Sequence, residues 1–427
     1  MTQTLICIST ALVAGLLMTR LVKRWHLPDV TSYLIAGVLL GPYLIGRLEI
    51  PGIGFHSFED VENLSMISDI AMGFIAFAIG NEFRLHTLKK TGKAAIVIGI
   101  FQAVAATIVV DLVLFGVHLI VGDKLPIAAV ITLGAIASAT APAATLMVVR
   151  QYKAEGEVTG VLLPVVAIDD AVGLILFAVS FGIARAMTSG ESGLVSIIVN
   201  PLLEIVFSLL LGLVLGWILP HLERAFQSNR NRVAMIAGFV VLAVALSSLS
   251  FTIGPVEIGF SSLLVCMMLG TAFCNICKKS AGLMDQADKW SAPFLVLFFV
   301  LSGAELHLDT FTDVAVVGIG IAYILARSAG KYIGAGISSR MMNCSDNVQK
   351  YLGITLLPQA GVALGMSAQA AGSLGETGSL IRNIVLFGVM IYEIIGPSLT
   401  RMALTAAGEI KPKESQNAAG KISPKES

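Results

Sequence analysis

The sequence predicts an all-α polytopic membrane protein, and three observations support that fold class. The chain has 427 residues, of which 56% are hydrophobic and only 13% are charged. Its mean hydropathy is +0.86. Apolar runs of about 17–25 residues, the length that crosses a bilayer as a helix, recur along almost the whole chain. This composition excludes an ordinary soluble domain, and the net charge of zero gives no reason to expect nucleic-acid binding.

Division of the apolar runs at charged or Gly/Pro-rich breaks predicts about thirteen membrane-spanning helices. They are expected near residues 3–22, 30–47, 64–83, 94–121, 126–149, 157–187, 199–220, 233–250, 257–277, 291–307, 314–339, 349–372 and 383–405. The first run has almost no charged leader and no small-residue cleavage site, so it is expected to remain as a span. The five cysteines are scattered in or beside apolar runs, which is typical of buried thiols and not of a disulfide framework.

The placement of lysine and arginine predicts the orientation in the membrane. With the N-terminus outside, the inner loops contain most of the basic residues. The outer loops are then left with Arg47, Lys124, Arg185 and Arg382. A basic excess of this kind predicts an inner (cell) membrane protein with a cytoplasmic C-terminus. Residues 408–427 are polar and repeat Pro-Lys-Glu-Ser, so this tail is expected to be disordered.

Two adjacent carboxylates, Asp169 and Asp170, lie inside the apolar run VVAIDDAVGLILF at 165–177. A carboxylate at the centre of a spanning helix costs about 2.5–3.5 kcal/mol on insertion scales, so such a residue indicates ion or proton handling. Neighbours on a helix point about 100° apart. One carboxylate can therefore pair with a cation while the other faces a water-filled cavity.

A basic helix is expected to provide that cation. Arg327 and Lys331 lie near the middle of the span at 314–339, and four residues separate them, so they share one helix face. Two unpaired cations there would be expensive, and the available partners are Asp169, Asp170 and Glu393. A static ion-pair network that holds the helices together is the alternative to a transport role.

Two spans are expected to be broken near the middle of the membrane. One contains ASATAPAA at 137–144 and the other contains LLPQAGVA at 356–363. Pro142 and Pro358 remove backbone donors, and small neighbours such as Ala141 and Gly361 let the chain open. The half-helix ends and freed carbonyls would then line an ion site. A simple proline kink is the alternative, but two such segments in matching positions favour function.

The chain also contains a weak internal repeat. Residues 80–85 (GNEFRL) and 303–308 (GAELHL) share the pattern Gly-x-Glu-x-x-Leu at the ends of two spans. By the predicted topology one end faces inward and the other outward, as inverted repeats require. The sequence therefore predicts one membrane domain at 1–407, with repeats at about 30–188 and 257–405.

Seven segments carry a resemblance to a known family. They are LPDVTSYLIAGVLLGP (27–42), FAIGNEF (77–83), SATAPA (138–143), AIDDAVGL (167–174), GKYIG (330–334), LPQAGVAL (357–364) and EIIGP (393–397). With these, the chain resembles the second branch of the cation:proton antiporter superfamily, and in particular the bacterial electrogenic sodium/proton antiporters with an Asp-Asp motif. The resemblance implies a six-helix core that moves against a dimerisation domain, two crossing broken helices, a homodimer in the lipid membrane and no cofactor.

The resemblance also implies roles for single residues. By motif, Asp170 looks like the carboxylate that alternately binds cation and proton. Asp169 looks like its partner and would pair with Lys331, for which Arg327 is a rival. Thr140 would line the cation site.

The sequence departs from the family pattern at Ala141. Many relatives have an aspartate after the threonine. The crossing therefore has less negative charge here to offset the half-helix dipoles.

The predicted activity is exchange of a monovalent cation, Na⁺ in the first place and otherwise Li⁺ or K⁺, for H⁺ by alternating access. If Lys331 releases a proton when Asp169 turns to the cation, two protons move per cation and the cycle is electrogenic. One alternative is a potassium/proton exchanger of the same architecture. The other is an intramembrane aspartyl protease, which needs two carboxylates from different helices that share a proton. Adjacent aspartates on one helix, next to two basic residues, do not favour that chemistry.

Overall fold

A computed structural model describes residues 2–22, 29–48, 50, 52–141, 145, 148–149, 152–188, 199–253 and 256–410. The regular structure in the described part of the chain is helical apart from one short hairpin, which fits the predicted all-α class. Eight of its helices are long and apolar enough to cross a membrane, and four shorter helices are also apolar. The protein is therefore a multi-pass membrane protein. The count of thirteen spans remains a prediction.

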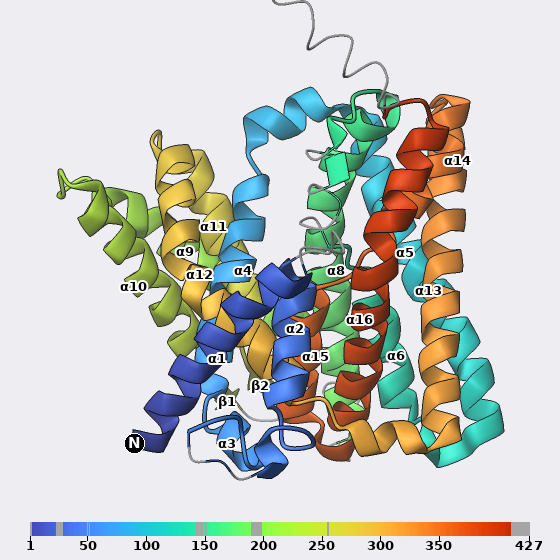
Figure 1. Cartoon of the computed structure of the whole chain (residues 1–427). Helices are drawn as coiled ribbons and strands as arrows, with labels where there is room; N and C mark the ends of the chain where they lie inside the picture. The colour runs from blue at the N-terminus through green and yellow to red at the C-terminus, as the bar shows by residue number, and fades with distance from the viewer. Residues whose placement is uncertain are drawn as a thin grey trace, which may run out of the picture.

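The helices form two bundles that pack mainly within themselves (Figure 1). We call the first the scaffold bundle; it contains α1 (Thr2–Val22), α2 (Asp29–Leu40), α4 (Ser65–Glu82), α9 (Asn200–Glu223), α10 (Asn229–Ser247), α11 (Ser262–Ile276) and α12 (Ser280–Ala304). We call the second the core bundle; it contains α5 (Leu85–Val121), α6 (Ile127–Ala137), α8 (Glu157–Thr188), α13 (Val314–Met341), α14 (Asp346–Thr355), α15 (Gly361–Ser373) and α16 (Gly375–Ala406). Short connecting elements are η2 (Gly46–Leu48), α3 (Phe58–Glu62), η3 (Gly122–Lys124), η5 (Leu308–Thr312), β1 (Phe251–Ile253) and β2 (Val256–Ile258).

In the scaffold bundle, α4 and α11 cross at a pair of glycines. A Cβ atom added to Gly80 would lie 2.0 Å from the carbonyl oxygen of Met267. A Cβ atom added to Gly270 would lie 2.2 Å from the carbonyl oxygen of Phe77. No side chain fits at either position, so the two backbones touch directly.

The contact between α2 and α12 has the same construction. A Cβ atom added to Gly37 would lie 1.9 Å from the Val300 carbonyl oxygen, and one added to Gly303 would lie 2.2 Å from the Leu34 carbonyl oxygen. Gly80 and Gly303 are the first residues of the two Gly-x-Glu-x-x-Leu segments. The repeated motif thus marks two equivalent close approaches of helix backbones.

In the core bundle, the longest helix, α5, packs along α13 through small residues. Gly330 of α13 lies against Ala106, and Gly334 lies against Gln102. The helix begins at Leu85, earlier than the predicted span, because a kink at Gly92 (φ 82°) joins a short helical segment to it. A left-handed conformation of this kind is open to glycine at little cost.

Several predicted boundaries change in the structure. The span expected from 257 begins at Ser262, because β2 pairs antiparallel with β1 just before it. Helices α12 and α16 start eleven and eight residues earlier than predicted, at Ser280 and Gly375, because one face of each polar extension is buried. Arg382, assigned to an outer loop, is therefore a buried residue of α16.

Ordered structure extends to the first residues of the tail that the sequence predicts to be disordered. Glu409 is buried, and its carboxylate accepts hydrogen bonds from the backbone amides of Val158 (2.6 Å) and Thr159 (2.9 Å) at the start of α8. The chain is thus held against the core bundle up to this point, because Glu409 satisfies amides that a helix N-terminus leaves without partners. The rest of the predicted tail, 411–427, lies outside the described residues.

Candidate ion-binding site

Two interrupted helices of the core bundle cross at the centre of the site. Helix α6 ends at Ala137, and the chain continues without helical structure through Ala141. Helix α14 ends at Thr355, and α15 begins at Gly361. The amide of Ala141 donates a hydrogen bond of 2.8 Å to the carbonyl of Pro358, so the two open segments touch. Both breaks occur where the sequence predicts them, although Pro142 itself lies outside the described residues.

Arg327 of α13 satisfies carbonyls that the breaks leave free. Its Nε donates to the carbonyl oxygen of Ala137 at 3.0 Å, and its Nη2 donates to that of Ala139 at 2.6 Å. Its Nη1 donates to the carbonyl oxygen of Leu357 at 2.6 Å, across the crossing. A planar guanidinium has donors in a fixed fork, which suits three acceptors held in one place. Arg327 therefore ties the two broken helices together.

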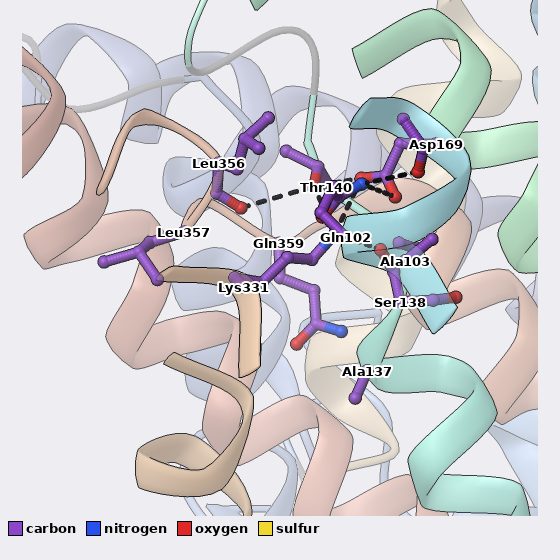
Figure 2. Close-up of polar contacts among 12 residues, drawn as sticks. Gln102, Ala103, Ala137, Ser138, Thr140, Asp169, Lys331, Leu356, Leu357 and Gln359 are labelled. Atoms are coloured by element: carbon purple, nitrogen blue, oxygen red, sulfur yellow. Dashed lines mark hydrogen bonds and ion pairs between the residues drawn. The ribbon is translucent and has the colours of Figure 1, made fainter. Parts of the chain in front are cut away.

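Lys331, one turn further along α13, forms an ion pair with Asp169 of α8. The Nζ and Oδ2 atoms are 2.7 Å apart, and both side chains are 0% exposed. The same Nζ donates to the hydroxyl of Thr140 at 2.9 Å and to the carbonyl of Ser138 (Figure 2). Of the two basic residues that the sequence offered as partners of Asp169, the structure places Lys331 in that position.

Asp169 is surrounded by donors on both oxygens. Thr140 donates its hydroxyl hydrogen to Oδ2, which also receives the Lys331 ammonium group. Gln102 of α5 donates from Nε2 to Oδ1 at 2.5 Å (Figure 2). Charge-assisted bonds are stronger than those between neutral groups, so they hold the Asp169 side chain firmly in place.

Asp170 follows on the same helix and is 2% exposed. Because neighbouring helical residues differ by about 100° in direction, its side chain leaves α8 on a different side from that of Asp169. The structure thus brings together Asp169, Lys331, Arg327 and Thr140 with the two breaks, with Asp170 next to them.

The possible ion pair of Glu393 with one of the two cations is not formed in the described residues. Glu393 of α16 is 1% exposed, and its Oε2 accepts a hydrogen bond of 3.3 Å from the hydroxyl of Thr31 on α2. Arg327 needs no carboxylate because its donors are used by carbonyls. Its guanidinium carbon instead lies 4.5 Å from the centre of the Tyr392 ring, a cation–π contact.

Two neutral polar residues of the site, Gln102 and Gln359, escaped sequence reasoning. Gln359, in the second break, donates from Nε2 to the carbonyl of Ile136 at 3.0 Å and to the hydroxyl of Tyr323 at 3.0 Å. Gln102, on α5, contacts Asp169 as described above. The signal that could have found the two glutamines is that each is a solitary amide within an otherwise apolar stretch.

Two broken helices that cross inside the membrane part of a protein, around buried carboxylates and cations, define a secondary transporter. The chain belongs to the sodium/hydrogen exchanger family, whose transmembrane model matches residues 8–405. This is a family of cation/proton antiporters and not of enzymes. The protease interpretation of the two aspartates is therefore dropped.

Individual relatives are distant. The chain is 24% identical over 400 residues to a Na(+)/H(+) antiporter of Enterococcus hirae, covering 90% of this chain and 94% of the relative. It is 25% identical over 334 residues to a glutathione-regulated potassium-efflux system protein of Haemophilus influenzae, covering 74% of this chain and 48% of that protein. The structure of the sodium proton antiporter MjNhaP1 from Methanocaldococcus jannaschii has the same fold, with a TM-score of 0.74 at 18% identity over 95% of this chain and 98% of that chain.

Proposed function

We propose that this protein exchanges sodium ions for protons across the cell membrane, and that Asp170 carries either ion in turn. The observation that supports the proposal most is the fully buried pair of Lys331 and Asp169 at the crossing of the two broken helices. Asp169 is bonded to Lys331, Thr140 and Gln102, and the next residue of α8, Asp170, is a second buried carboxylate beside this pair, to which we assign the transported ion by its position in the motif. A protonated Asp170 no longer attracts a cation, so one site serves both ions.

The oxygen atoms around the crossing suit a hard monovalent cation. Carboxylate, hydroxyl and carbonyl oxygens are the ligands that alkali ions prefer to nitrogen or sulfur. The Thr140 hydroxyl, which donates its hydrogen to Asp169, also lies 3.2 Å from the Leu356 carbonyl oxygen, an alternative acceptor for that hydrogen. We expect this hydroxyl to turn its oxygen toward the cation when Lys331 leaves Asp169.

Charge movement follows from the same pair. When a cation approaches Asp170, Asp169 turns toward it, and Lys331 loses its counter-ion in a dry site. A buried ammonium without a partner is costly, so Lys331 releases a proton. Two protons then move for each cation, and the cycle responds to voltage at about 2.3 kcal/mol per net charge per 100 mV.

The direct test is exchange by purified protein in liposomes with Asp170→Asn. We expect loss of sodium-dependent proton movement, because asparagine neither ionises nor takes up a proton. Asp123→Asn is the matched control, since Asp123 is an exposed carboxylate in η3, away from the crossing. Wild-type exchange rates in Asp170→Asn would refute the assignment of the carrier.

Potassium/proton exchange is the second candidate, and the resemblance to a potassium-efflux system protein supports it. Against it stands the Asp169-Asp170 pair, where the glutathione-gated potassium relatives are expected to have Gln-Asp. Exchange measured with sodium, lithium and potassium at equal concentrations separates the two candidates, because our proposal requires a higher rate with sodium than with potassium.

The orientation and assembly are also proposals. We expect the N-terminus outside and residue 410 in the cytoplasm, from the distribution of basic residues. We also expect a homodimer formed through the scaffold bundle, as the family resemblance implies. Protease accessibility in oriented vesicles tests the first, and the mass of the detergent-solubilised particle tests the second.

A further inference from the structure

A second buried arginine lies outside the ion site, between the two bundles. Arg382 of α16 is 4% exposed, and its guanidinium contacts Glu305, the residue that ends α12. The Nη2 and Nε atoms lie 2.6 Å and 2.9 Å from Oε2 of Glu305. Nη2 also donates to the hydroxyl of Ser302 at 3.0 Å. All three of these bonds reach from the core bundle to the scaffold bundle.

The remaining bonds of Arg382 stay within the core bundle. Its Nη1 donates to the carbonyl of Leu364 at 2.7 Å and to the hydroxyl of Ser367 at 3.1 Å, both on α15. The guanidinium of Arg382 therefore uses Nη1 for bonds within the core bundle and uses Nε and Nη2 for bonds to the scaffold bundle. If the bundles part, Arg382 keeps the first set and loses only the second.

The contact lies partly at the protein surface on its Glu305 side. The side chain of Glu305 is 30% exposed, in contrast to the fully buried Lys331–Asp169 pair. Glu305 can therefore reach water when the contact opens, whereas the buried Arg382 keeps its bonds to Leu364 and Ser367.

The contact of Arg382 with α12 is also connected to the ion site, through helix α15. Leu364 lies one turn after Gly361, where α15 begins at the second helix break. Arg382 thus holds the half-helix whose near end lies at the crossing with Ala141. A displacement of α12 is therefore transmitted to the ion site through the half-helix α15.

We propose that Arg382 and Glu305 form a lock between the core and scaffold bundles, which closes the membrane side opposite the C-terminus and must open once in each transport cycle. This inference rests on the proposed alternating-access exchange, because only that mechanism requires the bundles to move. In this view Arg382 is a positioning residue. It sets which side of the protein is closed and does not touch the ion.

A different ion pair serves as an internal control. Lys124 and Asp313 are 2.7 Å apart, but both belong to the core bundle: Lys124 follows α5 and Asp313 precedes α13. Because these two helices pack together along their length, a link between them should not restrict motion between bundles. The Lys124–Asp313 pair is more exposed than the Arg382–Glu305 pair, and it joins two helices of the same bundle.

Cross-linking tests the proposal. The hydroxyls of Ser302 and Ser367 bond the same guanidinium, so cysteines at these positions lie within reach of a short bis-methanethiosulfonate reagent. Complete cross-linking of Ser302→Cys/Ser367→Cys should reduce exchange about tenfold or more, and reductant should restore it. The same treatment of Lys124→Cys/Asp313→Cys, and of the wild type with its native cysteines, should leave exchange unchanged. Exchange above half the untreated rate in the fully linked Ser302/Ser367 variant would overturn the lock.

A second measurement does not depend on transport activity. A membrane-impermeant thiol reagent should label Ser302→Cys about tenfold faster when Glu305→Gln is added, because the charge that holds Arg382 across the interface is gone. Adding Lys124→Gln instead should not change the labelling rate. Equal labelling with and without Glu305→Gln would refute the lock. If the wild type itself fails to exchange ions in liposomes, the proposed function fails, and this labelling result still decides whether the contact opens.

Discussion

The buried pair of Lys331 and Asp169 allows a quantitative prediction about stability. Both side chains are 0% exposed at a separation of 2.7 Å, so removal of one partner leaves an uncompensated charge in a dry site. Such a loss costs about 3–5 kcal/mol in proteins. We expect Lys331→Gln and Asp169→Asn each to lower the free energy of unfolding by an amount in this range.

The double variant Lys331→Gln/Asp169→Asn should be less destabilised than the sum of the two single variants. Both charges are then absent, and the two amides can still bond to Thr140 and Gln102. The measurement is a double-mutant cycle built from the free energies of unfolding in detergent. The expected coupling energy between Lys331 and Asp169 is about 2–3 kcal/mol. Additive effects within about 0.5 kcal/mol would show that the two residues do not stabilise each other, and the reasoning from the buried pair would fail.

Three further predictions concern single elements. Arg327→Lys should destabilise the protein by at least about 2 kcal/mol in thermal unfolding, because one ammonium cannot reach the carbonyls of both breaks; stability equal to wild type would contradict the role of the fork. Glu409→Ala should cost about 0.5–2 kcal/mol, the range for a lost helix N-cap, and hydrogen exchange should increase at the start of α8; unchanged protection there would argue against the cap. The hydrogen bond from Lys124 lowers the pKa of Asp313, so this bond stabilises the protein above the ordinary carboxyl pKa of about 4 and ceases to do so as the pH falls through the lowered pKa. The melting temperatures of the wild type and of Lys124→Gln should therefore converge as the pH falls through that value. A difference that stays constant with pH would contradict the role of this bond.

The helix breaks and the charged residues of the site could be predicted because each leaves a strong local signal. A proline among small residues cannot continue an apolar helix, and a charge in an apolar run needs a partner. What the sequence left open was which cation binds Asp169, since Arg327 and Lys331 share one face of α13. The structure resolves this through backbone geometry, because the guanidinium matches three carbonyls and the ammonium group matches one carboxylate.

Other features of the fold carry no such local signal. Gln102 and Gln359 are uncharged, so a solitary amide in an apolar stretch is a weaker signal than a charge. Arg382 was placed in a loop because apolar residues dominate only after it, whereas the helix in fact extends eight residues further toward its start. Its partner Glu305 is 77 positions away, and only the packing of α12 against the core bundle brings the two together.

The three carbonyl bonds of Arg327 also bear on which ions the site accepts. The C-terminal ends of α6 and α14 each present about half a negative charge to the crossing, and the guanidinium neutralises their sum. Lys331 neutralises Asp169 in the same way. If Asp170 is the carrier, the charge left for an incoming ion is a single negative unit. At the first encounter, before Lys331 releases its proton, a monovalent ion balances this charge, whereas a divalent ion such as Ca²⁺ would leave an excess positive charge in a medium that solvates it poorly.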